Sequence, residues 1–217
     1  MQDFFANCAT VLQKYGFSYL RGAGTTLLLA LVGTFFGCLI GFAVGALQTI
    51  PIDKQRDPVW KRVLLKILHI FLRCYVELFR GTPMIVQAFI IYFGMPQLIQ
   101  KLFNPAFRLD PFTAGVITLS LNAGAYLSEI FRGGIQAVNK GQKEAARSLG
   151  LSEARTLFKI VLPQAFKVAL PSMVNQFIIT IKDTSILSVI GLADIVNKAK
   201  IYVGKSYQFF ATYIYVA

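Results

Sequence analysis

The sequence predicts an all-α membrane protein with about five transmembrane helices. Hydrophobic residues make up 55% of the 217 positions and the mean hydropathy is +0.58, which is too apolar for an ordinary soluble domain. Long runs without charge recur along the chain, and the basic residues cluster at the ends of these runs. That placement indicates that the net charge of +12 reflects membrane flanks and not a nucleic-acid surface.

The first transmembrane helix is expected at about residues 23–47. No charge occurs over residues 22–52, and a helix needs about 20 apolar residues to cross a bilayer. Residues 1–19 mix aromatic and polar side chains and are expected to form an N-terminal interfacial segment, followed by a single transmembrane domain over 20–217. Glycines recur every four residues in the first span, so they should line one face and let another backbone approach closely. These glycines are Gly33, Gly37, Gly41 and Gly45.

A narrow polar stripe follows the loop at residues 49–62. Six ionisable residues are spaced four, three, four, four and three positions apart, which places them on one side of an otherwise apolar helix. We favour an interfacial helix whose cations face anionic headgroups; the alternative places part of the stripe against a partner protein or a polar pathway. His69 has no second residue at ligand spacing, so no metal site is expected. The stripe consists of Arg62, Lys66, His69, Arg73, Glu77 and Arg80.

The second span is expected at about residues 81–100, which carry no charge. It opens with Gly81-Thr82-Pro83. Proline lacks a backbone N–H, so this tripeptide should kink the helix and leave carbonyls that need other partners.

The third span is expected at about residues 111–131, with Asn122 near its middle. Glu129 and Arg132 lie near its end, one helical turn apart. Polar groups at membrane depth usually mark function or a buried pair. For Glu129 and Arg132, a structural ion pair is at least as well supported as contact with a transported molecule.

The fourth span is expected at about residues 168–190 and carries an adjacent Lys182 and Asp183. Such residues must face protein, water or each other, and not lipid. A fifth apolar segment, 206–217, has only twelve uncharged residues and is too short to cross a bilayer. We interpret it as an incomplete span or as the start of a truncated one.

Residues 136–163, between the third and fourth spans, predict a helical hairpin. Gly150 should end a first short helix in the left-handed conformation, and Ser152 should cap a second. Pro163 should end that second helix. One interpretation is an amphipathic hairpin that lies on lipid headgroups; the one we favour is a docking element for another protein.

Several motifs together resemble a known family. Residues of the hairpin fit the spacing E-A-A-x3-G-x9-I-x-L-P from Glu144 to Pro163. This pattern resembles the cytoplasmic loop of the membrane subunits (permeases) of bacterial binding-protein-dependent ABC importers. Phe79-Arg80-Gly81-Thr82-Pro83 with Gln87, and Lys182-Asp183-Thr184-Ser185, are similar to the branch that carries polar amino acids such as histidine, glutamate, glutamine, arginine and opines. The resemblance spans roughly residues 20–205 and implies the MetI-like transmembrane fold.

The resemblance implies that the hairpin forms coupling helices, which sit in a groove on a separate ATPase. The chain has no G-x-x-x-x-G-K-[S/T] phosphate loop, so ATP and magnesium should be bound by that partner and no cofactor by this chain. The expected partners are two ATP-binding subunits, a second identical or paralogous permease, and an extracellular or periplasmic solute-binding protein. The residues expected to dock on the ATPase are Glu144, Ala145, Ala146, Arg147 and Gly150.

The expected function is therefore the import of a polar amino acid across the bacterial plasma membrane by alternating access. Alternatives are a permease for another small polar solute, or a channel-like membrane protein that works without an ATPase. Segments 49–80 and 132–167 hold 14 of the 22 Lys and Arg residues, which predicts a multi-pass topology with the hairpin in the cytoplasm. The residues expected along the substrate pathway are Thr82, Gln87, Asn122, Thr180 and Asp183.

Overall fold

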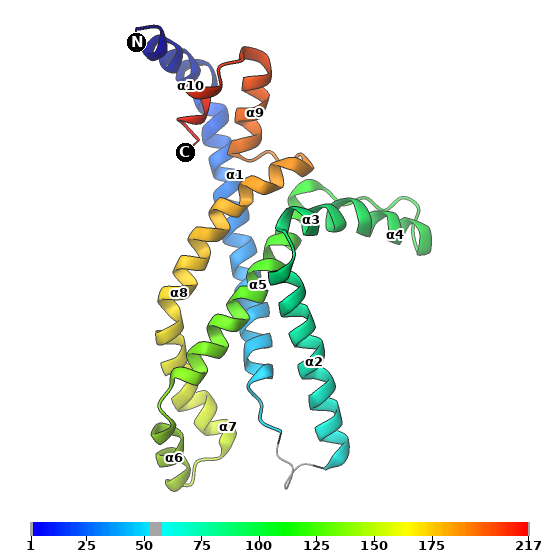
Figure 1. Ribbon diagram of the computed structural model, residues 1–217, viewed down its shortest axis with the longest axis vertical. Coiled ribbons are helices and arrows are strands. Elements are labelled where there is room, and N and C mark those ends of the chain that lie inside the picture. Colours follow the sequence, from blue (N-terminus) through cyan, green and yellow to red (C-terminus); the bar gives the residue numbers. More distant parts are fainter. Residues whose placement is uncertain (1, 53–57, 217) are drawn as a thin grey trace. The chain divides into compact units, whose positions relative to one another are not determined.

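The computed structural model describes residues 2–52 and 58–216, and within these ranges the chain is helical with no β-strand (Figure 1). This confirms the prediction of an all-α protein. In chain order the elements are α1 (Gln2–Gln48), α2 (Val59–Gly81), α3 (Met84–Phe89), the π-helical η1 (Ile90–Gly94), α4 (Met95–Leu102), α5 (Pro111–Ala137), α6 (Lys140–Ser148), α7 (Glu153–Thr156), the π-helical η2 (Leu157–Val161), α8 (Leu162–Asp183), the 3₁₀-helical η3 (Thr184–Ile190), α9 (Ile195–Ser206) and α10 (Phe209–Tyr213). The predicted loop at 49–62 lies partly outside the described residues.

The chain forms two compact units, each assembled from separate stretches of sequence. The first unit comprises Met1–Gly33, Met84–Leu119 and Ile179–Ala217. The second comprises Thr34–Pro83 and Ser120–Ile178. The long helices α1, α5 and α8 each contribute one part to each unit.

The core of the first unit joins α1 to the C-terminal helices. Val11 and Tyr19 are buried against Ala199 and Tyr202 of α9. Residues 2–19, expected to be an interfacial segment, thus belong to the same continuous helix as the first predicted span. Their position relative to a membrane stays a prediction.

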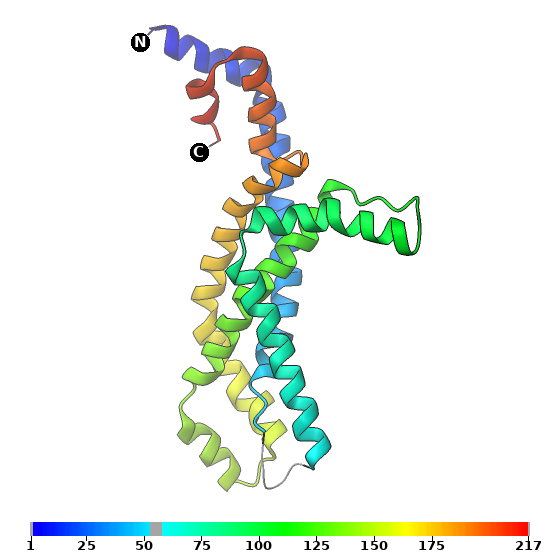
Figure 2. The same ribbon diagram turned by 45° about the vertical axis from the view of Figure 1, so that its right-hand side comes forward.

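The second unit contains the C-terminal end of α1, all of α2, and the joined ends of α5 and α8. Figures 1 and 2 both show α6 and α7 at the end of this unit where α5 stops and α8 begins. Val44 of α1 packs with Leu72 and Val76 of α2. The Tyr75 hydroxyl donates to the Leu121 carbonyl oxygen at 2.7 Å, which ties α2 to α5.

The glycine stripe of α1 is a close helix–helix contact with α5, as the sequence predicts. A Cβ added to Gly41 would lie 2.6 Å from the Leu127 Cβ and 2.9 Å from the Ser128 backbone nitrogen. Added at Gly45, it would lie 2.7 Å from the Ser128 carbonyl oxygen. These distances are too short for any side chain, so the packing of α1 on α5 requires glycine. The same contact is made by Gly33 on Leu119 in the first unit and by Gly37 on Ala123 in the second.

The expected kink at Gly81-Thr82-Pro83 is a complete break between α2 and α3. Thr82 closes α2, because both its backbone N–H and its hydroxyl donate to the Leu78 carbonyl oxygen, at 3.1 and 2.7 Å. The predicted span over 81–100 is therefore not one regular helix. It consists of α3, η1 and α4, with the π-helical turn just before Pro96.

Length and apolar composition identify two described helical segments that could cross a membrane, Val11–Gln48 and Glu153–Ile190. A third appears if the helices on both sides of the break at Thr82–Pro83 count as one span. α5 has the necessary length of 27 residues but includes Asn122 and several other polar residues. The count of five spans therefore stays a prediction.

Two aspartates cap helices in the first unit, and the pKa values of their carboxyl groups are shifted in opposite directions. Asp194 caps α9 by accepting from the Asn197 N–H at 2.9 Å, and it is fully buried. Burial raises the pKa of its carboxyl, against the lowering effect of that hydrogen bond. Asp110, which is exposed, accepts from the Phe112 and Thr113 N–H groups. Hydrogen bonds from the Thr113 side chain and backbone lower the pKa of the Asp110 carboxyl.

We predict that Gly41→Ala lowers the melting temperature of the purified protein. Overpacking costs about 1–3 kcal/mol, which exceeds the gain of about 1 kcal/mol from replacing a helical glycine by alanine. Gly24→Ala is the matched control in the same helix, because no atom lies within 4 Å of a Cβ placed there. Equal melting temperatures for the two variants would contradict the assignment of the stripe to packing.

We also predict opposite pH effects at Asp194 and Asp110. Since the folded-state pKa of Asp194 is raised, its ionised form opposes folding near neutral pH, and this penalty disappears as the pH falls through that pKa. Asp194→Asn keeps a capping side chain, so it should melt above the wild type at neutral pH, by a margin that shrinks on acidification. Asp110→Asn should melt slightly below the wild type at neutral pH, and that difference should vanish as the pH falls through the lowered pKa of Asp110. Thermal unfolding across a pH series measures both differences, and the same sign for both variants would contradict the opposite pKa shifts of Asp194 and Asp110.

Candidate functional site

The hairpin between α5 and α8 has the predicted structure from its first helix to the start of its second. Gly150 has φ +78°, and its N–H donates to the Arg147 carbonyl oxygen at 2.9 Å. The Leu151 N–H donates to the Ala146 carbonyl oxygen at 3.1 Å, which completes a Schellman motif at the end of α6. The Ser152 hydroxyl then caps α7 by accepting from the Arg155 N–H. We call Lys140–Val161 the α6–α7 hairpin.

Pro163 does not end the second helix, so that expectation was wrong. The chain passes from α7 through η2 into α8 without leaving the helical conformation. In η2 the hydrogen bonds run over five residues, as from the Leu162 N–H to the Leu157 carbonyl oxygen. This wider turn stands directly before Pro163, where an α-helical N–H donor is missing, and it lets the helix continue.

The outer surface of the hairpin exposes most of the residues expected to dock on an ATPase. Glu144, Ala145, Arg147 and Gly150 are exposed. Ala146 is 2% exposed and faces the interior, so it supports the hairpin and leaves no surface for a partner.

Arg147 also joins the two helices of the hairpin. Its guanidinium is 2.6 Å from the Glu153 carboxylate across the turn. Leu149, at the tip, is 84% exposed and adds apolar surface to the outer side of the hairpin.

The base of the hairpin is packed between α5 and α8. Ile135 and Val138, at the end of α5, form a buried cluster with Val161 and with Ala165 of α8. Gly134 brings α5 close to α8, since a Cβ there would lie 2.7 Å from the Ala165 carbonyl oxygen. The hairpin is therefore firmly attached to two long helices.

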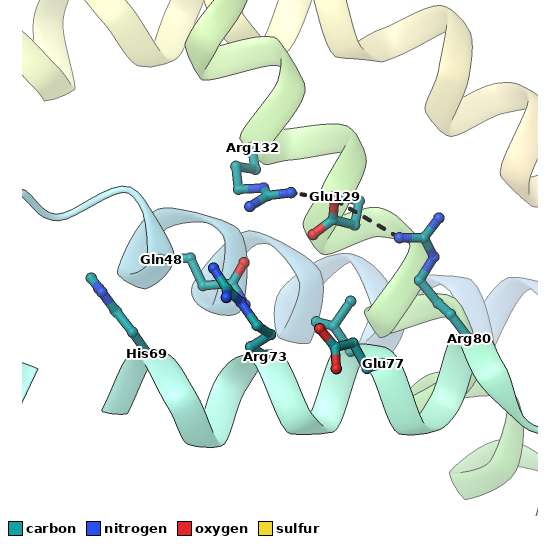
Figure 3. Close-up of a pocket in the computed structure, with 8 residues that line it drawn as sticks. Gln48, His69, Arg73, Glu77, Arg80, Glu129 and Arg132 are labelled. Atoms are coloured by element: carbon teal, nitrogen blue, oxygen red, sulfur yellow. Dashed lines mark hydrogen bonds and ion pairs between the residues drawn. The ribbon is translucent and has the colours of Figure 1, made fainter. Parts of the chain in front are cut away.

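A second feature of the same unit is a polar pocket between α2, α5 and the end of α1 (Figure 3). Its volume is about 300 Å³. Four of the six residues of the predicted stripe on α2 line it, opposite Glu129 and Arg132 of α5. Contact of the stripe with lipid headgroups stays a prediction. The lining residues are Gln48, His69, Arg73, Val76, Glu77, Arg80, Glu129 and Arg132.

Glu129 is the centre of an ion-pair network at one side of the polar pocket. Arg132 donates to its carboxylate at 2.6 Å, which confirms the predicted structural pair. Arg80 approaches the same carboxylate at 3.8 Å from α2, and its guanidinium lies 5.3 Å from the centre of the Tyr126 ring. The contact between the stripe and Glu129 was not predicted. The regular spacing on α2 was the available signal, but it does not say which helix the stripe faces.

The substrate-pathway residues predicted in the second unit make local hydrogen bonds to backbone. Asn122 is buried, and its amide donates to the Phe79 carbonyl oxygen at 3.3 Å. The Thr82 hydroxyl donates within α2, to Leu78. Neither residue lines the polar pocket.

The other three predicted residues lie in the first unit. Gln87 of α3 and Thr180 of α8 are buried, at 6% and 1% exposed. Asp183 is half-buried at the point where α8 passes into η3, and α3 packs against η3. The first unit thus gathers Gln87, Thr180 and Asp183 on elements that pack together or follow one another. Among the described residues no group of His, Cys, Asp and Glu side chains is arranged to hold a metal ion.

Comparison with known proteins defines the class of this protein. Residues 60–217 match the family model described as "Binding-protein-dependent transport system inner membrane component". The chain belongs to this family. It is therefore a membrane permease of the ABC importer type and not an ATPase subunit.

Two curated proteins are similar to this chain in sequence. The arginine transport system permease protein ArtQ of Bacillus subtilis (strain 168) is 39% identical over 180 residues, covering 83% of this chain and 74% of that protein. The glutamine transport system permease protein GlnP of Escherichia coli (strain K12) is 37% identical over 181 residues, with the same coverage.

Solved structures give the same fold. The crystal structure of an amino acid ABC transporter with histidines superposes with a TM-score of 0.79 at 36% identity, covering 94% of this chain and 86% of that chain. An inward-facing MetNI methionine ABC transporter superposes with a TM-score of 0.73 at 19% identity, covering 93% and 88%, and shows the fold alone. The MetI-like fold expected from the sequence motifs is confirmed.

Proposed function

We propose that this chain is the transmembrane subunit that carries a polar amino acid into a bacterial cell by alternating access. The observation that carries the proposal is the α6–α7 hairpin, whose exposed outer surface and firmly packed base suit transmission of force from another protein. The amino acid is inferred from the relatives, which are named for arginine and glutamine transport. The family as a whole works with a solute-binding protein and an ATPase.

The orientation follows from charge. Segments 49–80 and 132–167 carry 14 of the 22 Lys and Arg residues, and such residues concentrate on cytoplasmic segments. We therefore place the hairpin in the cytoplasm of a multi-pass chain. Two ATP-binding subunits would dock there and supply ATP and magnesium, and the solute-binding protein would deliver substrate on the opposite side. A second permease, identical or paralogous, would complete the pathway.

The hairpin would act as the coupling element. Closure of the two ATPases on ATP would pull on Glu144, Ala145, Arg147 and the turn at Gly150. Because the base of the hairpin is packed on α5 and α8, this displacement would pass to both helices and switch the pathway between outward and inward access.

Reconstitution tests the proposal directly. The complex of the permease with its ATPase and solute-binding protein is placed in proteoliposomes, and uptake and ATP hydrolysis are measured with a panel of amino acids. ATP-dependent uptake of one or a few polar amino acids is expected. Uptake that needs no ATPase would support a channel, and uptake only of other small polar solutes would replace the substrate assignment.

We predict that Gly150→Val abolishes ATP-driven uptake and weakens association with the ATPase, while the protein still inserts in the membrane. No atom lies within 4 Å of a Cβ at this position, so the damage comes from φ +78°, which costs a β-branched residue about 1–3 kcal/mol and should change the turn. Gly150→Asn should keep most of the activity, since asparagine tolerates this conformation. Full coupling in the valine variant, measured by co-purification and uptake, would refute the role of the turn.

We predict that Asn122→Ala and Asp183→Asn raise the KM for uptake by about tenfold or more, because each removes a charge-assisted or polar contact with the substrate. Lys182→Gln, which removes a neighbouring exposed charge, is the control for Asp183. Melting temperatures separate loss of binding from loss of folding. Unaltered uptake kinetics in both variants would exclude these residues from the pathway.

A further inference from the structure

The second unit contains another cavity, between the inner side of the α6–α7 hairpin, the end of α5 and the end of α1. Its volume is about 540 Å³, within the range of about 300–1,000 Å³ for small-molecule sites. Most of the residues around it are apolar, and we call it the apolar cavity. Its apolar wall includes Ala46, Ile50, Ile135, Ala154, Leu157 and Val161.

The apolar cavity lies where the expected spans leave the membrane on the side of the hairpin. The uncharged run at residues 22–52 ends here, since Ala46 and Ile50 belong to the cavity wall. The span expected at 111–131 stops about one helical turn before Ile135. Acyl chains give way to headgroups at the end of a span. The cavity is therefore within reach of both parts of a lipid molecule.

One positive charge at the apolar cavity is not compensated by the protein. Arg147 and Glu153 line the cavity, but they pair with each other at 2.6 Å and contribute little net charge. Lys143, half-buried on α6, forms no ion pair with another described residue. The cavity thus combines apolar walls with a single available cation, which suits a molecule with an apolar chain and an anionic head.

Thr156 adds an unused hydroxyl group to the same wall. The residue is 4% exposed, and its Oγ1 atom is buried without a hydrogen-bond partner among the described residues. Such a group is uncommon in proteins. Rotation of χ1 to another staggered position exchanges the methyl and hydroxyl groups of threonine, and it would present the hydroxyl to a molecule in the cavity.

We propose that the apolar cavity binds one anionic phospholipid of the bilayer. An acyl chain enters between Ile135, Leu157 and Val161, and Lys143 binds the phosphate. The Thr156 hydroxyl donates to an oxygen of the lipid. A lipid with a cationic headgroup fits less well, because its cation would meet Lys143. A small polar solute fits poorly, since the apolar walls would leave its polar groups without partners.

The bound acyl chain would extend the packed base of the hairpin toward α1. Ile135 and Val161 already belong to the buried cluster that attaches the hairpin to α5 and α8. A chain in the cavity contacts both residues and also Ala46 and Ile50 at the end of α1. The lipid site goes beyond the proposed function, because it depends on neither the transported solute nor the presence of ATP.

Photolabelling of the permease–ATPase complex in lipid vesicles tests the site. The probe is a phosphatidylglycerol with a diazirine at the end of one acyl chain, in vesicles of phosphatidylcholine, and labelled residues are mapped by mass spectrometry. Label is expected on Ile135 and Val161, which are 2% and 1% exposed and are not reached by lipid on the outer surface. A phosphatidylcholine with the same diazirine should label them about fivefold less, the weight of one basic residue at an anionic lipid surface.

Two variants address the headgroup and the chain separately. Lys143→Gln should reduce labelling of Ile135 and Val161 by phosphatidylglycerol about fivefold, to the level of phosphatidylcholine. Lys140→Gln is the matched control, an exposed lysine of the same helix outside the cavity. Ala154→Trp, at an exposed position of the wall, should fill the cavity and remove this label while lipid-exposed Phe71 on α2 is labelled as before.

Any of four results would overturn the lipid site. These are no label on Ile135 and Val161 in the wild-type complex, as when the ATPase fills the cavity; equal labelling by the two lipids; undiminished labelling in Lys143→Gln; and displacement of the probe by inorganic phosphate, which would indicate a simple anion site. ATP-dependent uptake is measured separately. Loss of the lipid site would leave the proposed function standing, and failure of uptake with the label intact would refute the function alone.

Discussion

The close contact of α1 with α5 is the constraint on which the rest of the structure depends. Four glycines at four-residue spacing let the two backbones approach to distances that no side chain would allow. In a membrane, where lipid is as apolar as leucine, close packing of this kind replaces the hydrophobic effect as the force that joins helices. α5 then presents Glu129 and Arg132 to α2, and at its end it carries the base of the α6–α7 hairpin.

This arrangement puts the two candidate functional features of the second unit on one helix. Glu129 and Arg132 of the polar pocket precede Ile135 and Val138 of the hairpin base by only a few residues on α5. A displacement of the hairpin would thus reach the pocket through a single rigid element. In the transport cycle we propose, α5 would connect the position of the hairpin to the ion pairs of the polar pocket without a long chain of intervening contacts.

Charge placement explains why these features lie where they do. Ionisable residues cannot face the lipid interior at low cost, and four of those on α2 line the pocket opposite α5, which supplies a compensating carboxylate for Arg80 at Glu129. The apolar residues on the other sides of α2, such as Trp60 and Phe71, remain exposed in the single chain and are suited to lipid or to another subunit. The helix is therefore amphipathic in a sense opposite to that of soluble proteins, with its polar side toward the protein.

Much of this could be predicted from the sequence because the signals are local. The glycine period, the end of α6 at Gly150, the Ser152 cap and the pairing of Glu129 with Arg132 each depend on residues within a few turns of one helix. The hairpin motif was also specific enough to give the family and its fold.

The tertiary structure decided what depends on distant residues. The sequence could not show that Arg80 reaches Glu129, that Ala146 faces inward, or that a π-helical turn would carry the chain past Pro163. Nor could it show that four residues of the stripe on α2 line a pocket together with residues of α5. Periodicity fixes which residues share a helix face, because it follows from helix geometry alone. Packing between segments far apart in the chain decides which element that face contacts. The sequence pattern of one helix does not contain this information.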